Sequence, residues 1–175
     1  MPTTEFEVLH PFNDGNGRIG RLLIVLQLLR EGVLHEPLLT VSPWFEARRR
    51  EYQDKLRVLS ETGSWDDWVA FFAEGVGSQA ASTADKVTRL LAYQEECRSL
   101  VRELGLRGVA VDVAGGLIGR PILTAAWVAT THGVSRQAAT TAVARLVDAG
   151  ILRETTGATY GRVYAADAVI RILAL

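Results

Sequence analysis

A stretch near the start of the chain, from His10 to Arg21, holds the side chains best suited to chemistry. It reads HPFNDGNGRIGR and combines an imidazole base, a carboxylate, glycines, amides and two arginines. A largely apolar run from Leu22 to Leu29 follows at once and predicts a buried helix. A glycine-rich turn that opens into a helix leaves backbone N–H groups unpaired, and these attract an anion such as phosphate. The segment therefore predicts an anion-binding loop.

Side chains around this loop strengthen the phosphate prediction. Arg18 and Arg21 lie three positions apart, so they share one helical face and both could reach one polyphosphate. Asp14 precedes the helix and could hold a magnesium ion that bridges phosphate oxygens. His10 stands about one turn away and could deprotonate a hydroxyl. A base, a metal ligand and a phosphate-binding loop are the parts of a site for nucleotidyl or phosphoryl transfer.

Each of these residues also has an ordinary structural interpretation. His10, which precedes a proline, suits a helix C-cap or a surface position, and Asp-Gly and Asn-Gly are common turn dipeptides. Arg18 and Arg21 would then form the solvated face of an amphipathic helix. These interpretations do not explain why all the residue types coincide in one short segment, so we favour the anion-binding site.

The segment also resembles the signature of the Fic family, HPFx(D/E)GNGRxxR, with every signature position filled. Most Fic proteins transfer AMP from ATP to a hydroxyl side chain of a target protein, and some members transfer other nucleotidyl or phosphoryl groups. The resemblance implies that His10 is the general base and that Asp14 holds Mg²⁺ on the α- and β-phosphates. It also implies that Phe12 is a buried anchor that fixes the loop.

The phosphate-binding residues that the resemblance implies follow directly along the chain. Gly15, Asn16 and Gly17 would form the nest that binds the anion. Arg18 would contact the triphosphate, and Arg21 would support its β/γ end. The implied cofactors are ATP and Mg²⁺, and the implied partner is a target protein with a hydroxyl side chain.

Composition limits the class of protein. The chain has 175 residues with 48% hydrophobic content, which is too high for disorder and enough for a buried core. Its one cysteine, Cys97, excludes an internal disulfide framework and is most simply a small apolar filler on a helix. The first residues lack the pattern of a secretory signal, and no apolar run approaches the ~20 residues of a membrane span. We expect a bacterial, cytoplasmic protein without a membrane segment.

The pattern along the chain predicts a mainly α fold. After the motif helix, from about Gly17 to Arg30, we expect a helix capped by Ser42 whose aromatic and leucine side chains are core. Separate helices are predicted over 65–72 and from about 82 to 104. The segment ETGSWDDWVAFFAEGV resembles the helices that follow the motif in larger bacterial Fic proteins. The resemblance therefore covers residues 1–104, which we expect to be the C-terminal part of a Fic helical bundle.

The segment from Leu104 to Gly108 is the predicted boundary to a second domain, residues 105–175. Charge changes sign there: residues 1–104 hold 12 basic and 16 acidic side chains, and residues 105–175 hold 7 and 4. Helices are predicted over 109–118, 125–131, with a possible Thr124 cap, and 136–148, with a Ser135 cap. A two-stranded hairpin over 151–164 and a last helix from Asp167 follow.

This order is that of a winged helix-turn-helix domain, and VSRQAATTAVARLVDAGILRE resembles the recognition helix and first wing strand of bacterial examples. DNA contacts, made somewhere within 120–165, would come from the exposed polar side chains of that helix and wing: Arg136, Gln137, Thr140, Thr141, Arg145 and Arg162. The alternative is a domain that contacts protein or itself, because two arginines and no lysine are few for binding duplex DNA. The fold alone does not decide.

One departure from the Fic pattern concerns the start of the chain, because Fic proteins normally carry several helices and a target-docking flap upstream of the motif. We therefore expect the 175 residues to be an incomplete, weakly active or inactive piece of a protein adenylyltransferase. Apolar side chains left bare on the motif helix should drive formation of a homo-oligomer. The alternative from another class is a DNA-binding transcriptional regulator whose Fic part senses a nucleotide.

Overall fold

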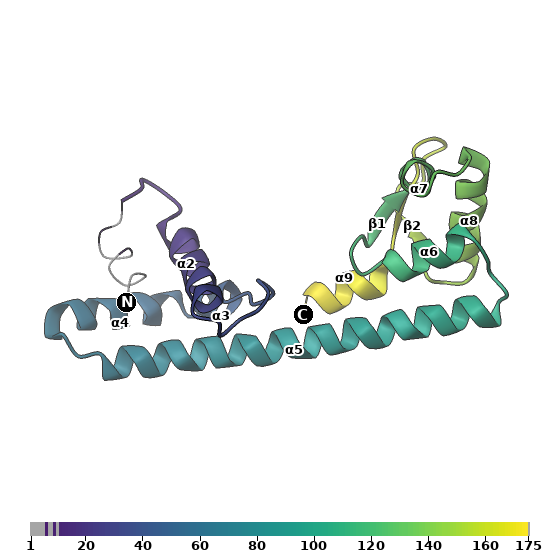
Figure 1. The fold of residues 1–175 in the computed structure, drawn as a ribbon. Helices are drawn as coiled ribbons and strands as arrows, with labels where there is room; N and C mark the ends of the chain where they lie inside the picture. The colour runs from purple at the N-terminus through teal and green to yellow at the C-terminus, as the bar shows by residue number, and fades with distance from the viewer. Residues whose placement is uncertain (1–5, 7–8, 10, 175) are drawn as a thin grey trace. The chain divides into compact units, whose positions relative to one another are not determined.

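The computed structural model describes residue 6, residue 9 and residues 11–174 of the chain. The chain divides into two compact units, residues 1–85 and residues 86–175, and the division falls within the long helix α5 (Asp66–Glu103). Figure 1 shows helices along most of the chain and a small sheet in the C-terminal unit. The mainly α fold class is confirmed.

The N-terminal unit contains α2 (Asn16–Arg30), α3 (Ser42–Ala47), α4 (Arg49–Thr62) and the first part of α5. The motif helix was expected at about Gly17–Arg30, and α2 confirms it. The core of the N-terminal unit is an aromatic cluster from α3, α4 and α5. In it the Phe45 ring packs edge-to-face on the Trp44 ring, at a centroid distance of 5.1 Å, and on the Tyr52 ring, at 5.5 Å. Such pairs add to the burial of apolar area in holding the three helices together.

The helix expected to start with Ser42 as its cap is divided in the structure. Arg48 leaves helical geometry, at φ −113° and ψ 31°, and separates α3 from α4. Its guanidinium lies 4.3 Å from the centroid of the Trp44 ring, where a cation–π contact holds it. Ser42 is not the N-cap, because Val41 occupies that position and the Ser42 hydroxyl accepts a hydrogen bond from Arg21 instead.

The gap expected between the helices over 65–72 and 82–104 does not exist, because α5 runs continuously from Asp66 to Glu103 (Figure 1). The prediction of two separate helices was wrong, and Gly75 and Gly77 lie inside the continuous helix despite the low helix propensity of glycine. Gly75 has a packing role: a Cβ there would lie 2.6 Å from the Trp44 ring and 2.8 Å from the Phe45 ring. The close approach of α5 to α3 therefore requires a glycine at this position.

The C-terminal unit contains the end of α5, then α6 (Val109–Gly116), β1 (Ile122–Thr124), α7 (Ala125–His132) and α8 (Arg136–Asp148). The strands β2 (Arg153–Glu154) and β3 (Val163–Ala165) and the helix α9 (Asp167–Ala174) follow. The predicted caps are confirmed, since the Thr124 hydroxyl accepts from the Trp127 N–H and the Ser135 hydroxyl accepts from the Ala138 N–H.

The expected two-stranded hairpin is part of a three-stranded antiparallel sheet in the order β1-β3-β2. β1 was predicted only as an extended piece, and it pairs with β3 through Leu123 opposite Tyr164. The core beneath the sheet includes Val128, Leu146 and Val169, together with Cys97 from α5. Burial raises the pKa of the Cys97 thiol, which fits its expected role as an apolar filler. None of the described helices combines the length and the hydropathy needed to span a membrane.

Candidate functional site

The motif lies on one side of a cavity of about 810 Å³ within the N-terminal unit. Residues 13–18 and Arg21 line it from the loop and the first turns of α2, and side chains of α3 and α4 line the opposite side. The structure therefore brings together the described members of the predicted phosphate site. Ser42, Glu46 and Arg49 also line the cavity, although they are far from the motif along the chain. Arg49 belongs to a run of three arginines, Arg48 to Arg50, for which the sequence favoured a solvated helix face over a phosphate contact.

Asn16 fixes the shape of the loop through its side chain. Its Oδ1 accepts a hydrogen bond of 3.0 Å from the Phe12 N–H, and its Nδ2 donates to the Phe12 carbonyl. Only 2% of Asn16 is exposed, and both the oxygen and the nitrogen of its amide bond the Phe12 backbone. The Asn16 group left without a partner is its backbone N–H, and not its side chain.

Gly15 stands at the N-cap of α2 and has a left-handed backbone, with φ 86°. A residue there must tolerate positive φ, which favours glycine. Because Gly15 has no side chain, no side-chain cap closes the start of α2. The backbone N–H groups of Asn16, Gly17 and Arg18 find no acceptor among the described residues. These three groups are the open donors that an anion would occupy.

Asp14 and Arg18 form an ion pair across the mouth of the loop. The Arg18 Nη2 lies 3.1 Å from the Asp14 Oδ2, while the Asp14 Oδ1 accepts from the Gly15 N–H at 2.7 Å. The Arg18 side chain is 75% exposed, and an exposed pair of this kind contributes little to stability. Both side chains can therefore be turned toward a ligand at small cost.

Arg21 is held much more firmly than Arg18. Its side chain is only 13% exposed; Nε donates to the Ser42 hydroxyl at 3.1 Å, and Nη2 lies 3.2 Å from the Glu46 carboxylate. Glu46 also lies 3.9 Å from Arg49, so α2, α3 and α4 are linked through charged side chains in the cavity wall. The two motif arginines share the cavity but differ in mobility: Arg21 is a fixed positive group and Arg18 a movable one.

Phe12 does not have the burial expected of an anchor, because half of it (50%) is exposed. Among the described residues, its ring has one aromatic neighbour, Phe6, at a centroid distance of 6.2 Å. The backbone of Phe12 is anchored instead, by the amide of Asn16. The expected buried ring is therefore corrected to an anchored main chain.

His10, the predicted base, lies outside the described residues. The described part of the chain contains no cluster of three or more His, Cys, Asp or Glu side chains able to hold a metal ion by itself. Magnesium commonly takes one carboxylate together with substrate phosphates and water, so a single exposed Asp14 beside the open N–H groups fits that coordination.

The side chains expected to contact DNA are exposed on α8 and on the loop before β3. On α8 these are Arg136, Gln137, Thr140, Thr141 and Arg145. Arg162 is also exposed, but its Nε donates to the Ala158 carbonyl within the loop at 2.8 Å. The Thr140 hydroxyl donates to the Arg136 carbonyl, so it too has a partner within its own element.

Comparison with known proteins identifies the motif segment. Residues 3–28 match the Fic/DOC family. A probable protein adenylyltransferase of Aquifex aeolicus is 36% identical over 58 residues, which are 33% of this chain and 18% of that protein. The resemblance predicted from the motif is therefore confirmed for this segment. The chain spans less than a fifth of the length of that relative.

Proposed function

We propose that this protein transfers AMP from ATP to a hydroxyl side chain of a target protein. The observation that carries the proposal is the open start of α2, where three N–H groups without acceptors belong to residues that line the same cavity as the two motif arginines. A polyphosphate supplies the acceptors that these donors lack. The family of the motif segment and the relative named as a probable protein adenylyltransferase support the same activity.

In the proposed site Asp14 would hold Mg²⁺. The Gly15 N–H already donates to Asp14, so the backbone N–H groups of Asn16, Gly17 and Arg18, and not those of Gly15, Asn16 and Gly17, would meet the phosphates. Bound Mg²⁺ would neutralise charge on the α- and β-phosphates. Arg18 would leave the ion pair with Asp14 to reach the triphosphate. Arg21, oriented by Ser42 and Glu46, would stay in place and support its β/γ end.

The proposed chemical step is a displacement at the α-phosphorus of ATP. The target oxygen forms a bond to this phosphorus while the bond to the oxygen bridging the α- and β-phosphates breaks, and pyrophosphate leaves. His10 accepts the proton of the target hydroxyl. A related possibility keeps the same site and transfers a phosphoryl group from the γ-position instead.

Radioactive ATP separates these two reactions in the complete protein that contains these residues. We expect protein to become labelled from ATP carrying the label on the α-phosphate and not on the γ-phosphate. His10→Ala should lower labelling by about 10²–10⁴-fold with nucleotide binding nearly intact. Asp14→Ala should weaken magnesium-dependent binding instead. Label transferred from the γ-phosphate, or undiminished labelling by the His10 variant, would contradict the proposal.

We infer further that residues 105–175 form a winged helix-turn-helix domain, with α8 as the second helix of the pair and β2 and β3 as the wing. The inference is supported by the order α6, β1, α7, α8, β2, β3 and by the capped turn between α7 and α8. A DNA-binding regulator with a nucleotide-sensing Fic part is the second candidate function. The exposed Arg136 and Gln137 near the start of α8 favour it.

We also propose that the chain self-associates through α2. Leu22 and Leu26 lie one turn apart on this helix and are 56% and 49% exposed. Adjacent exposed leucines form an apolar patch that a second molecule would cover. Light scattering should show a dimer or larger species, and Leu22→Gln with Leu26→Gln should yield a monomer. If the unmutated 175-residue chain is a monomer, this proposal is refuted.

A further inference from the structure

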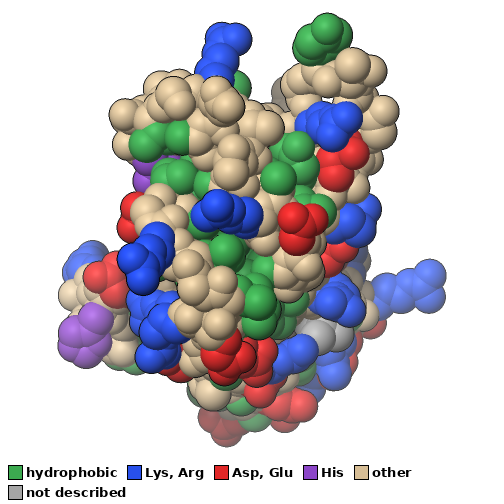
Figure 2. All heavy atoms as spheres, turned by 90° about the vertical axis from the view of Figure 1, so that its right-hand side faces the viewer, with side chains coloured by type: hydrophobic (Ala, Val, Ile, Leu, Met, Phe, Trp, Pro, Cys, Tyr) green, Lys and Arg blue, Asp and Glu red, His purple; other side chains and the backbone are tan. Residues whose placement is uncertain are grey.

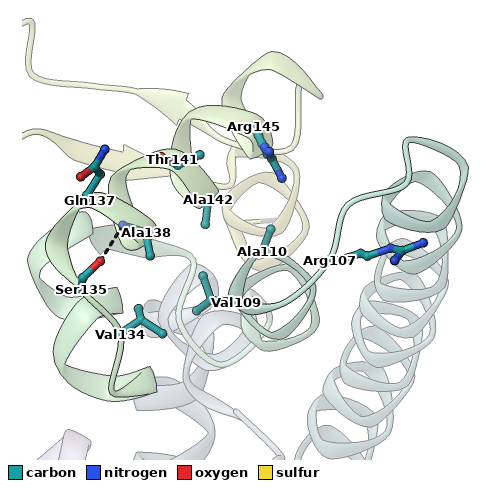
Figure 3. Close-up of a pocket in the computed structure, with 10 residues that line it drawn as sticks. All are labelled: Arg107, Val109, Ala110, Val134, Ser135, Gln137, Ala138, Thr141, Ala142 and Arg145. Carbon is teal, nitrogen blue, oxygen red and sulfur yellow. Dashed lines mark hydrogen bonds between the residues drawn. The ribbon is translucent and has the colours of Figure 1, made fainter.

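A second hollow, of about 480 Å³, lies in the C-terminal unit and takes no part in the motif site. Figure 3 shows it between α6, which contributes Val109 and Ala110, and α8, which contributes Ala138 and Ala142. Val134, from the turn before α8, closes one end. These side chains are small and apolar, so the floor of the hollow suits a compact apolar group.

The rim of this hollow is polar and positively charged. Arg107 lies on the segment ahead of α6 and Arg145 near the end of α8, and no acidic side chain lines the hollow (Figure 3). Neither arginine has an acidic partner among the described residues. Gln137 and Thr141 of α8 also line it, and their side chains make no hydrogen bond within the described part of the chain. In contrast, the Ser135 hydroxyl is used as the helix cap.

We propose that this hollow docks a segment of a partner protein in which a carboxylate lies next to a small apolar side chain. The apolar group would fill the floor between α6 and α8, and the carboxylate would meet Arg145. Gln137 and Thr141 would bond to the backbone of the segment. The positive charge at the rim favours the carboxylate, and the apolar floor favours the small apolar side chain beside it.

The apolar floor favours a protein segment over DNA. A duplex would contact exposed side chains such as Arg136 and would leave a recessed floor of alanine and valine unused. Figure 2 views the molecule from the side on which α8 lies in Figure 1. Hydrophobic side chains gather there in a strip, and basic and acidic side chains alternate around it without forming a broad basic surface. Such a surface offers little to a phosphate backbone.

Selection experiments on the 175-residue chain test the proposal directly. The chain is immobilised and used to select from a random short-peptide library and, separately, from a random pool of duplex DNA. Arg145→Glu reverses the charge at the rim, and Ala138→Glu places a carboxylate in the hollow at an exposed position of the helix. Arg136→Glu is the matched change on the same helix outside the hollow. Arg145→Gln removes the charge without reversing it and is a milder change at the same position. Circular dichroism of every variant shows whether the helices remain folded, so that loss of binding is distinguished from loss of folding.

We expect enrichment of peptides that carry an acidic residue next to a small apolar one. Their affinity should fall by about tenfold or more in Arg145→Glu and Ala138→Glu, less in Arg145→Gln, and remain unchanged in Arg136→Glu. Enrichment of no such pattern, or equal binding to all variants, would overturn the proposal. Retention of duplex DNA that Arg145→Glu abolishes would overturn it too and would assign the hollow to nucleic acid.

Discussion

The helices α2 and α8 begin in opposite ways, although each follows a tight turn. α8 begins with Ser135, whose hydroxyl accepts the Ala138 N–H, so its first turn is partly satisfied by its own side chain. α2 begins with Gly15, which has no side chain, and the amide of Asn16 turns back to the Phe12 backbone. The difference shows how a helix start is closed for stability or left open for a ligand.

The largest predicted effect comes from removing the amide that shapes the open start. Asn16→Ala removes two partly buried hydrogen bonds to the Phe12 backbone, each worth about 0.5–1.5 kcal/mol, so it should cost about 1–3 kcal/mol of unfolding free energy. Binding of ATP should fall at least in proportion, because the loop loses its shape. Urea unfolding and titration calorimetry measure the two effects.

The matched change at the closed start is Ser135→Ala. It should cost about 1 kcal/mol, the usual value of a lost helix cap, and leave ATP affinity unchanged. If both variants lowered ATP affinity alike, the contrast between the two helix starts would have no functional meaning.

The next effect concerns the left-handed residue at the open start. Gly15→Ala places a Cβ at φ 86°, which should cost about 1–2 kcal/mol, although its nearest neighbour, Arg18 Nη2, is at an ordinary 3.6 Å. Because the strain is relieved by moving the loop, ATP binding should weaken as well. Gly77→Ala, at an open helical position in α5, should instead stabilise the protein by about 0.5–1 kcal/mol. A Gly15→Ala variant that is as stable as the unmodified chain, or more stable, would contradict the left-handed backbone assigned to Gly15.

A smaller effect separates the two motif arginines. Arg21→Ala removes contacts with Ser42 and Glu46 and should cost about 1–2 kcal/mol of stability. Arg18→Ala breaks only an exposed pair and should change stability by less than about 0.5 kcal/mol while still reducing ATP affinity. Thermal unfolding with and without ATP distinguishes them. A large loss of stability in Arg18→Ala would show that the Asp14 pair is not the weak contact described here.

The smallest predicted effect is a pH dependence confined to the C-terminal unit. The Arg153 guanidinium holds the pKa of Asp167 below its usual range, and the Thr156 hydroxyl does the same for Glu154. A carboxyl with a lowered folded-state pKa adds stability above its unfolded pKa, and that stability is lost as pH falls through the folded value. The melting temperature of this unit should therefore fall slightly as the pH is lowered below about 4. Asp167→Asn should flatten the profile, and an unaltered profile would exclude the pair as its cause.

Local signals in the sequence were enough to predict several helix boundaries of this molecule. The caps Thr124 and Ser135 and the span of α2 follow from residue types within a few positions of each other. What the sequence did not predict depends on contacts between distant segments. Gly75 lies inside the continuous α5 because two aromatic rings of α3 pack against it and leave no room for a side chain. The Ser42 hydroxyl accepts a hydrogen bond from Arg21, although 21 positions separate the two residues. The role of Asn16 was missed although its partner, Phe12, is only four positions away, because the resemblance assigned a different role to each of these two residues.

The backbone amide signals of the 175-residue chain test the central claim most directly. In ¹H–¹⁵N spectra recorded while ATP and Mg²⁺ are added, the amides of Asn16, Gly17 and Arg18 should shift most, because they are the open donors at the start of α2. The Ala138 amide, already bonded to Ser135, should not move. Inorganic tripolyphosphate should reproduce the shifts in part. Saturating ATP that leaves these three amides unmoved, or that shifts α8 instead, would contradict the account.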